Sequence, residues 1–198
     1  MNTRILTATK KNIEEAAEVI KKGGLVVYPT DTVYGLGCDP FNVNAVRKLI
    51  EAKGERDKPL PILACRMIDV ERIAELSERA RKLGEKYWPG PLTLVLPRRS
   101  LPDVVTLGSA AVGVRIPGNP IAMTLLEHSG GLLVGTSANK TGQPPSSTAL
   151  EAYEQLKDNV DVVLDGGSAK LRVSSTVIDL TGKEVKMLRK GPLIIQEL

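Results

Sequence analysis

The fold is decided by the stretch Leu25-Val26-Val27-Tyr28-Pro29-Thr30-Asp31-Thr32-Val33-Tyr34-Gly35-Leu36-Gly37. Its first four residues form an apolar run that predicts a buried strand, which Pro29 ends because proline cannot donate to a sheet. The polar residues that follow stand beyond the carboxyl end of this strand, where ligands bind in α/β sheets. Taken alone, however, the stretch favours a tight strand-exit turn with capping hydroxyls.

Helices and strands alternate on both sides of this stretch. A helix before it is expected to start at Asn12 as a capping box with Glu15 and to stop at Gly23-Gly24. The other expected helices lie at about Asn44–Ala52, twice within Asp69–Tyr87, from Asn119 to Gly130 and at Thr148–Leu156. The other expected strands are Leu60–Ala64, Leu92–Leu96, Val112–Ile116, Leu132–Val134, Val160–Leu164, Thr176–Leu180 and Val185–Leu188. This order predicts an α/β fold with a twisted mixed parallel and antiparallel sheet flanked by helices.

Two segments carry more specific expectations. Pro61 predicts an edge position or an irregular pairing for the strand Leu60–Ala64. Residues 97–110 show no clear period and predict a loop. Because no repeat or linker divides the chain, we expect one domain over residues 1–198.

The composition is that of a globular protein with a small excess of cations. Hydrophobic residues make up 42% of the chain, charged residues 25%, and the net charge is +4. This charge suits an anionic ligand such as a nucleotide, or transient contact with tRNA, but a lysine-rich surface explains it equally well. The start of the chain lacks the apolar region of a signal peptide, and no apolar run approaches the about 20 residues of a membrane span. We therefore expect a cytoplasmic protein with no membrane partner.

Cysteine and histidine are too few for a metal centre held by the protein. Cys38 and Cys65 lie in or beside apolar segments and are expected as reduced thiols, while His128 stands alone near a helix end. Two cysteines and one histidine do not form a convincing tetrahedral zinc site, so no metal ligands are predicted. The lone histidine also gives no support to a covalent Cys-His or Ser-His mechanism.

Two more polar segments lie beside predicted strands. Lys53-Gly54-Glu55-Arg56-Asp57-Lys58 places three cations between a helix and a strand, which suits phosphate, although its two acids also suit a solvated loop. Gly135-Thr136-Ser137-Ala138-Asn139-Lys140-Thr141-Gly142 offers hydroxyl and backbone donors to a phosphate or carboxylate, or is an ordinary polar loop. The glycine pattern of a P-loop or of a dinucleotide-binding turn does not occur in the chain.

Together these segments resemble the YrdC-like threonylcarbamoyl-AMP synthases. The matching segments occur in the family's order from about Asn12 to Gly191. They are Thr30–Gly37, Lys53–Leu60, Trp88–Thr93, Val114–Pro117, Ser137–Asn139, Ser175-Thr176 and Leu188-Arg189. The segments Pro29–Gly37 and Trp88–Thr93 are specific, so a chance match to both is implausible.

The resemblance implies an L-threonine site. Thr30, Arg115 and Ser175 would hold the amino acid, with Arg115 pairing its carboxylate. The backbone around Gly135 would add to this pocket.

The resemblance also implies an ATP site and a catalytic pair. The implied ATP contacts are Lys53, Arg56, Ser137, Asn139 and Arg189, with the backbone at Pro145 nearby. Lys53 and Arg56 would face the triphosphate as the catalytic pair. The family's Lys-x-Arg signature is one residue longer here, because Gly54 and Glu55 both separate the two cations.

The implied reaction uses L-threonine, bicarbonate or CO2, and ATP. The threonine amine would capture bicarbonate to give an N-carboxylate, which would attack the α-phosphate of ATP and release pyrophosphate. Catalysis would rest on positioning and on cations near phosphate, with Mg2+ bridging the phosphates. A downstream tRNA threonylcarbamoyl transferase would use the resulting adenylate for tRNA modification.

Two other functions stay open from the residues. The basic charge also suits a non-catalytic double-stranded RNA or tRNA-binding module, but aromatic residues make up only 3% of the chain and offer few stacking platforms. The resemblance extends to related enzymes that handle carbamoyl-adenylate with the same fold.

Overall fold

A computed structural model describes residues 2–54 and 58–195, and their strands form two mixed sheets. Sheet A contains, in bonding order, β1 (Arg4–Thr7), β9 (Val162–Asp165), β2 (Val26–Tyr28), β3 (Gly35–Gly37) and β8 (Thr136–Ser137). Sheet B contains β11 (Lys186–Arg189), β10 (Thr176–Asp179), β5 (Leu92–Pro97), β6 (Ala111–Arg115), β4 (Ile62–Ala64) and β7 (Leu132–Val134). Each sheet has parallel and antiparallel pairs, which confirms the mixed α/β fold, although the strands divide between two sheets.

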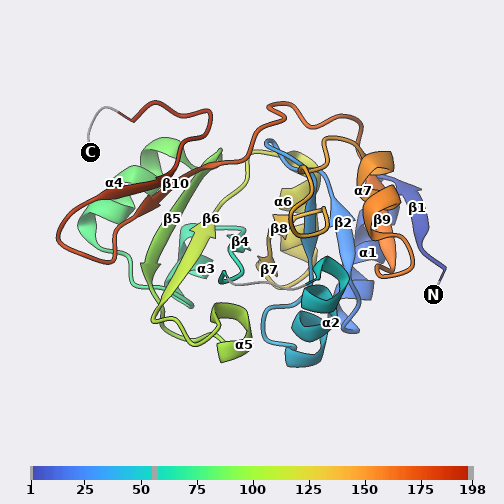
Figure 1. The fold of residues 1–198 in the computed structure, drawn as a ribbon, viewed down its shortest axis with the longest axis horizontal. Helices are drawn as coiled ribbons and strands as arrows, with labels where there is room; N and C mark the ends of the chain where they lie inside the picture. The colour runs from blue at the N-terminus through green and yellow to red at the C-terminus, as the bar shows by residue number, and fades with distance from the viewer. Residues whose placement is uncertain (1, 55–57, 196–198) are drawn as a thin grey trace.

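Helices pack on both sheets. They are α1 (Lys10–Lys21), α2 (Val43–Lys53), α3 (Met67–Glu71), α4 (Glu78–Tyr87), α5 (Asp103–Thr106), α6 (Pro120–His128) and α7 (Ala149–Leu156). Figure 1 shows sheet A with α1, α6 and α7 in one half of the molecule, and β5, β6 and β10 of sheet B with α4 in the other. None of the helices among the described residues has the length and apolar character needed to span a membrane.

Strand β2 lies at the centre of the core because both of its faces are buried. Val26 and Tyr28 pack in a cluster with α1 and α6, whereas Val27 points into the larger cluster that extends to sheet B. This two-sided burial explains the uninterrupted apolar run of the sequence.

The two sheets join where β2 and β3 meet β7. The Tyr28 hydroxyl donates to the carbonyl of Val134 at 3.1 Å, and the backbone N–H of Val134 donates to the carbonyl of Cys38 at 3.0 Å. Because the polar groups at this junction are buried, each needs the partner that the other sheet supplies.

Most of the expected elements are confirmed, but the start of the first helix is wrong. Helix α1 begins at Lys10, and its N-cap is Thr9, whose side chain accepts from the backbone N–H of Asn12. Asn12 is therefore inside the first turn, where its side-chain amide donates to the carbonyl of Thr7. A capping hydroxyl three residues earlier satisfies the helix end that Asn12 was expected to satisfy.

Short elements were missed or misplaced. The short strands β1, β3 and β8 were not predicted, and α5 interrupts the expected loop at residues 97–110. The edge position inferred from Pro61 is also wrong, because β4 starts one residue later at Ile62 and pairs on both sides, with β6 and β7.

The cysteine prediction is confirmed in its structural part. Cys38 and Cys65 are both free and buried. Burial raises the pKa of the Cys38 thiol to about 12, so this side chain is a neutral core residue.

Replacing Tyr28 with Phe tests the junction between the sheets. The Tyr28→Phe substitution leaves the Val134 carbonyl buried without this donor, so we expect the free energy of unfolding to fall by about 1–3 kcal/mol. Urea denaturation measures the change. Tyr153→Phe on α7 is the control, since Tyr153 is only partly buried and should change stability little; equal effects of the two substitutions would contradict the role of the junction.

Candidate functional site

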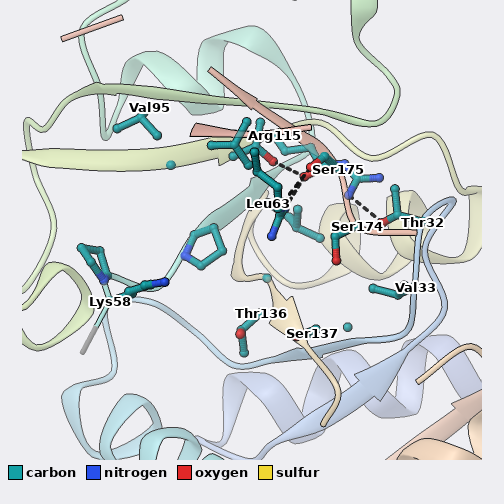
Figure 2. A pocket seen from close by; sticks show the side chains of 18 of the residues that line it. Thr32, Val33, Lys58, Leu63, Val95, Arg115, Thr136, Ser137, Ser174 and Ser175 are labelled. Atoms are coloured by element: carbon teal, nitrogen blue, oxygen red, sulfur yellow. Dashed lines mark hydrogen bonds between the residues drawn. The ribbon is translucent and has the colours of Figure 1, made fainter. Parts of the chain in front are cut away.

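A cavity of about 570 Å³ opens between the two sheets. Sheet B supplies one wall through alternate residues of its strands, including Thr93 and Val95 of β5 and Ala111, Gly113 and Arg115 of β6. Sheet A supplies Gly35, Thr136 and Ser137, and the turn after β2 supplies Thr30, Thr32, Val33 and Tyr34. Figure 2 shows Arg115, Thr32 and Ser175 grouped on one side of the cavity and Lys58 on the other.

Arg115 is the buried cation of this cavity. It stands at the end of β6, and its guanidinium forms an ion pair with Asp31 in the turn after β2. Its Nε also donates to the carbonyl of Gly90 at 2.9 Å, and its Nη1 to the hydroxyl of Thr32 at 2.8 Å. Burial lowers the pKa of Arg115, and Asp31 offsets part of that effect by stabilising the charged form.

The carboxylate of Asp31 is itself held in place. Its Oδ1 accepts from Arg115 and from the backbone N–H of Gly118 at 3.0 Å. Asp31 comes from sheet A, whereas Arg115 and the segment just after it come from sheet B. The ion pair therefore ties the two walls of the cavity together.

The hydroxyls of Thr30 and Thr32 continue this network along the turn. Thr30 Oγ1 donates to the carbonyl of Val33 at 2.7 Å, so the proton between Thr32 Oγ1 and Thr30 Oγ1, 2.9 Å apart, belongs to Thr32. Arg115 donates to Thr32, which donates to Thr30, which donates to the backbone. This chain of bonds fixes the orientation of both side chains before any ligand binds.

Ser175 and Arg189 form a second group on the wall. The Ser175 hydroxyl lies 2.7 Å from that of Thr93, and Arg189 donates to the Ser175 carbonyl at 2.9 Å and to its hydroxyl at 3.0 Å. Arg189 has no carboxylate within ion-pair distance among the described residues. Partial desolvation lowers the pKa of Arg189, although the residue stays exposed to solvent on one side of the wall.

The charge of the wall favours anions. Arg115, Arg189 and Lys58 line the cavity, and no described lining residue is Asp or Glu. Carboxylate and phosphate groups are the ligands that such a surface recognises. The described residues also hold no group of three or more His, Cys, Asp or Glu side chains that could bind a metal ion.

Six of the residues implied by the resemblance line this cavity. They are Thr30, Arg115, Gly135, Ser137, Ser175 and Arg189. Gly135 is required by close approach, because a Cβ there would stand 2.3 Å from Cγ of Leu63. Arg56 lies outside the described residues, so its assignment stays a prediction.

Lys53, Asn139 and Pro145 lie behind or beside the cavity wall. The ammonium of Lys53, at the end of α2, donates to the carbonyls of Ser137 at 2.6 Å and Asn139 at 2.7 Å. The Asn139 side chain donates to the carbonyls of Lys140 and Gln143. These bonds shape the loop that presents Ser137, whereas Pro145 is exposed on the same loop; direct contacts of Lys53, Asn139 and Pro145 with ATP stay predictions.

Several residues of the site were not predicted. Thr93 is a lone hydroxyl within the apolar strand β5, and this signal could have indicated it. The lining residues Thr32 and Lys58, and Asp31 behind the wall, stood in the polar segments already singled out but received no role. Leu63 showed no signal, because an apolar strand residue looks the same whether it faces a core or a cavity.

Comparison with known proteins gives the relatives of this chain. A family model for Sua5/YciO/YrdC, described as "Telomere recombination", matches residues 18–191. A threonylcarbamoyl-AMP synthase from Pyrococcus abyssi is 40% identical over 202 residues and covers 98% of this chain. A putative threonylcarbamoyl-AMP synthase from Mycobacterium tuberculosis is 39% identical, covering 95% of this chain and 88% of that protein.

A solved structure also shares the fold. P. abyssi Sua5 complexed with L-threonine superposes with a TM-score of 0.91 at 39% identity and covers 96% of this chain. This chain spans 59% of the length of the P. abyssi synthase and 57% of the solved Sua5 chain.

Replacing Asp31 with Asn tests the ion pair that joins the walls. Asp31→Asn keeps the size of the side chain but leaves the buried guanidinium of Arg115 without its counter-charge. We expect the free energy of unfolding to fall by about 3–5 kcal/mol, measured by chemical denaturation.

The matched control is Asp103→Asn. Asp103 pairs with Arg98 but its side chain is 80% exposed, so the loss should stay below about 1 kcal/mol. A loss for Asp31→Asn as small as that of the control would contradict the role of the buried pair.

Proposed function

Because this chain belongs to the Sua5/YciO/YrdC family, we propose that it is a threonylcarbamoyl-AMP synthase. The reaction converts L-threonine, bicarbonate or CO2, and ATP into L-threonylcarbamoyladenylate and pyrophosphate. Its relatives at 39–40% identity carry this name, and a relative has been solved with L-threonine bound.

The observation that carries the proposal is the preorganised guanidinium of Arg115. The described residues take three of its five N–H groups, through Gly90, Thr32 and Asp31. The remaining two N–H groups, one on Nη1 and one on Nη2, are available to a carboxylate. We assign the carboxylate of L-threonine to this position, with the hydroxyls of Thr32 and Ser175 beside it.

ATP has room in the same cavity. A volume of about 570 Å³ is within the range of small-molecule sites, about 300–1,000 Å³. Ser137 and Arg189 would contact the nucleotide, and Lys58 supplies a further cation at the wall. Lys53 would act on ATP through the loop it holds, because its ammonium binds the carbonyls of Ser137 and Asn139.

The chemistry requires positioning more than a nucleophile of the protein. The neutral amine of threonine adds to bicarbonate and loses water, which gives an N-carboxylate. An oxygen of that carboxylate attacks the α-phosphorus, the bond to the β-phosphate oxygen breaks, and pyrophosphate carries away the electron pair. The protein's part is to hold the two anions together and to stabilise the charge that develops on phosphate.

Mg2+ belongs to this proposal as a companion of ATP. The lining residues described here are cations, hydroxyls and apolar groups, which do not fit a resident magnesium site. The ion would therefore bind the phosphates of ATP and neutralise part of their charge.

The lability of the product indicates which partner the protein needs. Threonylcarbamoyl-AMP is a mixed anhydride that water hydrolyses, so a second enzyme, a tRNA threonylcarbamoyl transferase, would have to receive it quickly. Direct contact with tRNA and location in the cytoplasm are part of the same proposal.

Pyrophosphate release tests the proposal directly. Purified protein with ATP, Mg2+, bicarbonate and L-threonine should release pyrophosphate and form an adenylate of the expected mass, followed by mass spectrometry. Omitting threonine or bicarbonate should abolish both. Arg115→Ala should lower kcat/KM for threonine by at least about 100-fold, because a buried charged contact is lost, whereas exposed Arg79→Ala should not.

Two outcomes separate this function from its alternatives. Adenylate formation from carbamoyl phosphate but not from threonine would favour a carbamoyl-handling enzyme. Tight tRNA binding without pyrophosphate release would favour an RNA-binding module.

Lys53→Met tests how the loop at Ser137 contributes. Methionine keeps the length of the side chain but removes the donor to two buried carbonyls, so the KM for ATP should rise and stability should fall by about 1–3 kcal/mol. Steady-state kinetics and denaturation measure the two effects. Lys48→Met, on the exposed side of α2, is the control, and a Lys53 variant with full activity would refute the assignment.

A further inference from the structure

Gly191 lies against the backbone that carries Ser175. A Cβ on Gly191 would stand 2.3 Å from the backbone N of Thr176, 2.5 Å from the carbonyl carbon of Ser175 and 2.7 Å from the carbonyl oxygen of Ser174. All three are backbone atoms, which cannot move aside by changing a rotamer. Gly191 is outside the positive-φ region, so close approach and not backbone conformation requires glycine here.

The segment that Gly191 touches, residues 174–176, contains Ser175 and also binds the side chain of Arg189. Ser175 bonds to Thr93 through its hydroxyl, and both its carbonyl and its hydroxyl accept from Arg189. Arg189 is two residues before Gly191 on the same strand exit. A shift of the backbone at Ser175 would therefore move the acceptors that orient Arg189.

Hydrogen bonds of Thr176 also tie this segment to the residues after Gly191 and to Pro91. Its hydroxyl accepts from the backbone N–H of Leu193 at 3.1 Å, and its own N–H donates to the carbonyl of Pro91 at 3.0 Å. The segment 191–193 and the start of β10 are thus packed as one unit.

Arg189 is a wall cation that has no carboxylate partner among the described residues. Arg115 is paired with Asp31, whereas the described residues place no carboxylate at Arg189. The attraction of this part of the wall for an anion therefore depends on how Arg189 is oriented.

We propose that Gly191 is a positioning residue that seats Ser175 and Arg189 as one unit. Given the proposed function, Ser175 belongs to the threonine site and Arg189 to the ATP site. Gly191 then fixes the relative position of the threonine site and the ATP site, although it touches neither substrate.

Gly191→Ala tests the proposal. An ordinary contact needs at least 3.4 Å, so the variant forces the two backbones apart by about 1 Å. Such a displacement lowers kcat/KM by about 100-fold, and the KM values for threonine and ATP should rise together. Gly182→Ala is the matched control in the same hairpin, because its Cβ would meet nothing closer than 4.0 Å.

A double-mutant cycle separates positioning from loss of stability. If Gly191 acts through Ser175, adding Gly191→Ala to Ser175→Ala should change the KM for threonine less than twofold. Independent, multiplicative effects would overturn the proposal, as would a Gly191→Ala variant with a lower Tm and unchanged KM values.

A second variant covers the case in which Gly191→Ala does not fold. Thr176→Val removes the hydroxyl that binds Leu193 without adding a clash, and it should raise both KM values, with Thr176→Ser restoring them. Unchanged KM values in Thr176→Val would overturn the proposal.

A crystal structure of the Gly191→Ala variant tests the positioning role of Gly191 independently of the proposed function. If the wild-type protein releases no pyrophosphate, the function fails, but the structure of Gly191→Ala still reports on positioning. The Thr93–Ser175 hydroxyl pair, 2.7 Å apart in the wild type, should be separated beyond hydrogen-bond distance. An unchanged pair would overturn the role of Gly191.

Discussion

The buried ion pair between Arg115 and Asp31 is the interaction on which the rest of the site depends. Burying two charges costs several kcal/mol for each ion, and further hydrogen bonds offset part of this cost. Gly90 and Thr32 supply such bonds to Arg115, and Gly118 supplies one to Oδ1 of Asp31, whereas Oδ2 of Asp31 has no partner among the described residues. Because Asp31 follows β2 of sheet A and Arg115 ends β6 of sheet B, the pair also fixes the spacing of the cavity walls.

Much of the fold followed from local patterns in the sequence. The apolar run that includes β2, the Asn119 cap with Pro120 of α6 and the glycine stop after α1 all act within a few residues, so their signals are complete in the sequence. The strands β3 and β8 contain only three and two residues, and β8 is a strand because it pairs with β3 across about 100 positions. No local preference encodes such a pairing, nor the division of the strands into two sheets.

In the site too, the sequence indicated single residues but not the contacts between distant ones. The resemblance identified Thr30, Arg115 and Ser175 by segment, and the structure brings them to one cavity. It could not indicate that Asp31 neutralises Arg115, because that contact joins residues 84 positions apart. Likewise, the resemblance implied an ATP contact for Lys53, but it could not indicate that the ammonium binds the carbonyls of Ser137 and Asn139, which approach Lys53 only in the folded chain.

In the proposed function, the cavity between the sheets binds L-threonine through Arg115. The most direct measurement is a crystal structure of this protein grown with L-threonine. We expect electron density for the amino acid in the cavity, with its carboxylate on the Arg115 guanidinium and Asp31 still paired behind it. Threonine bound elsewhere, or with its carboxylate on Arg189 instead, would overturn this assignment.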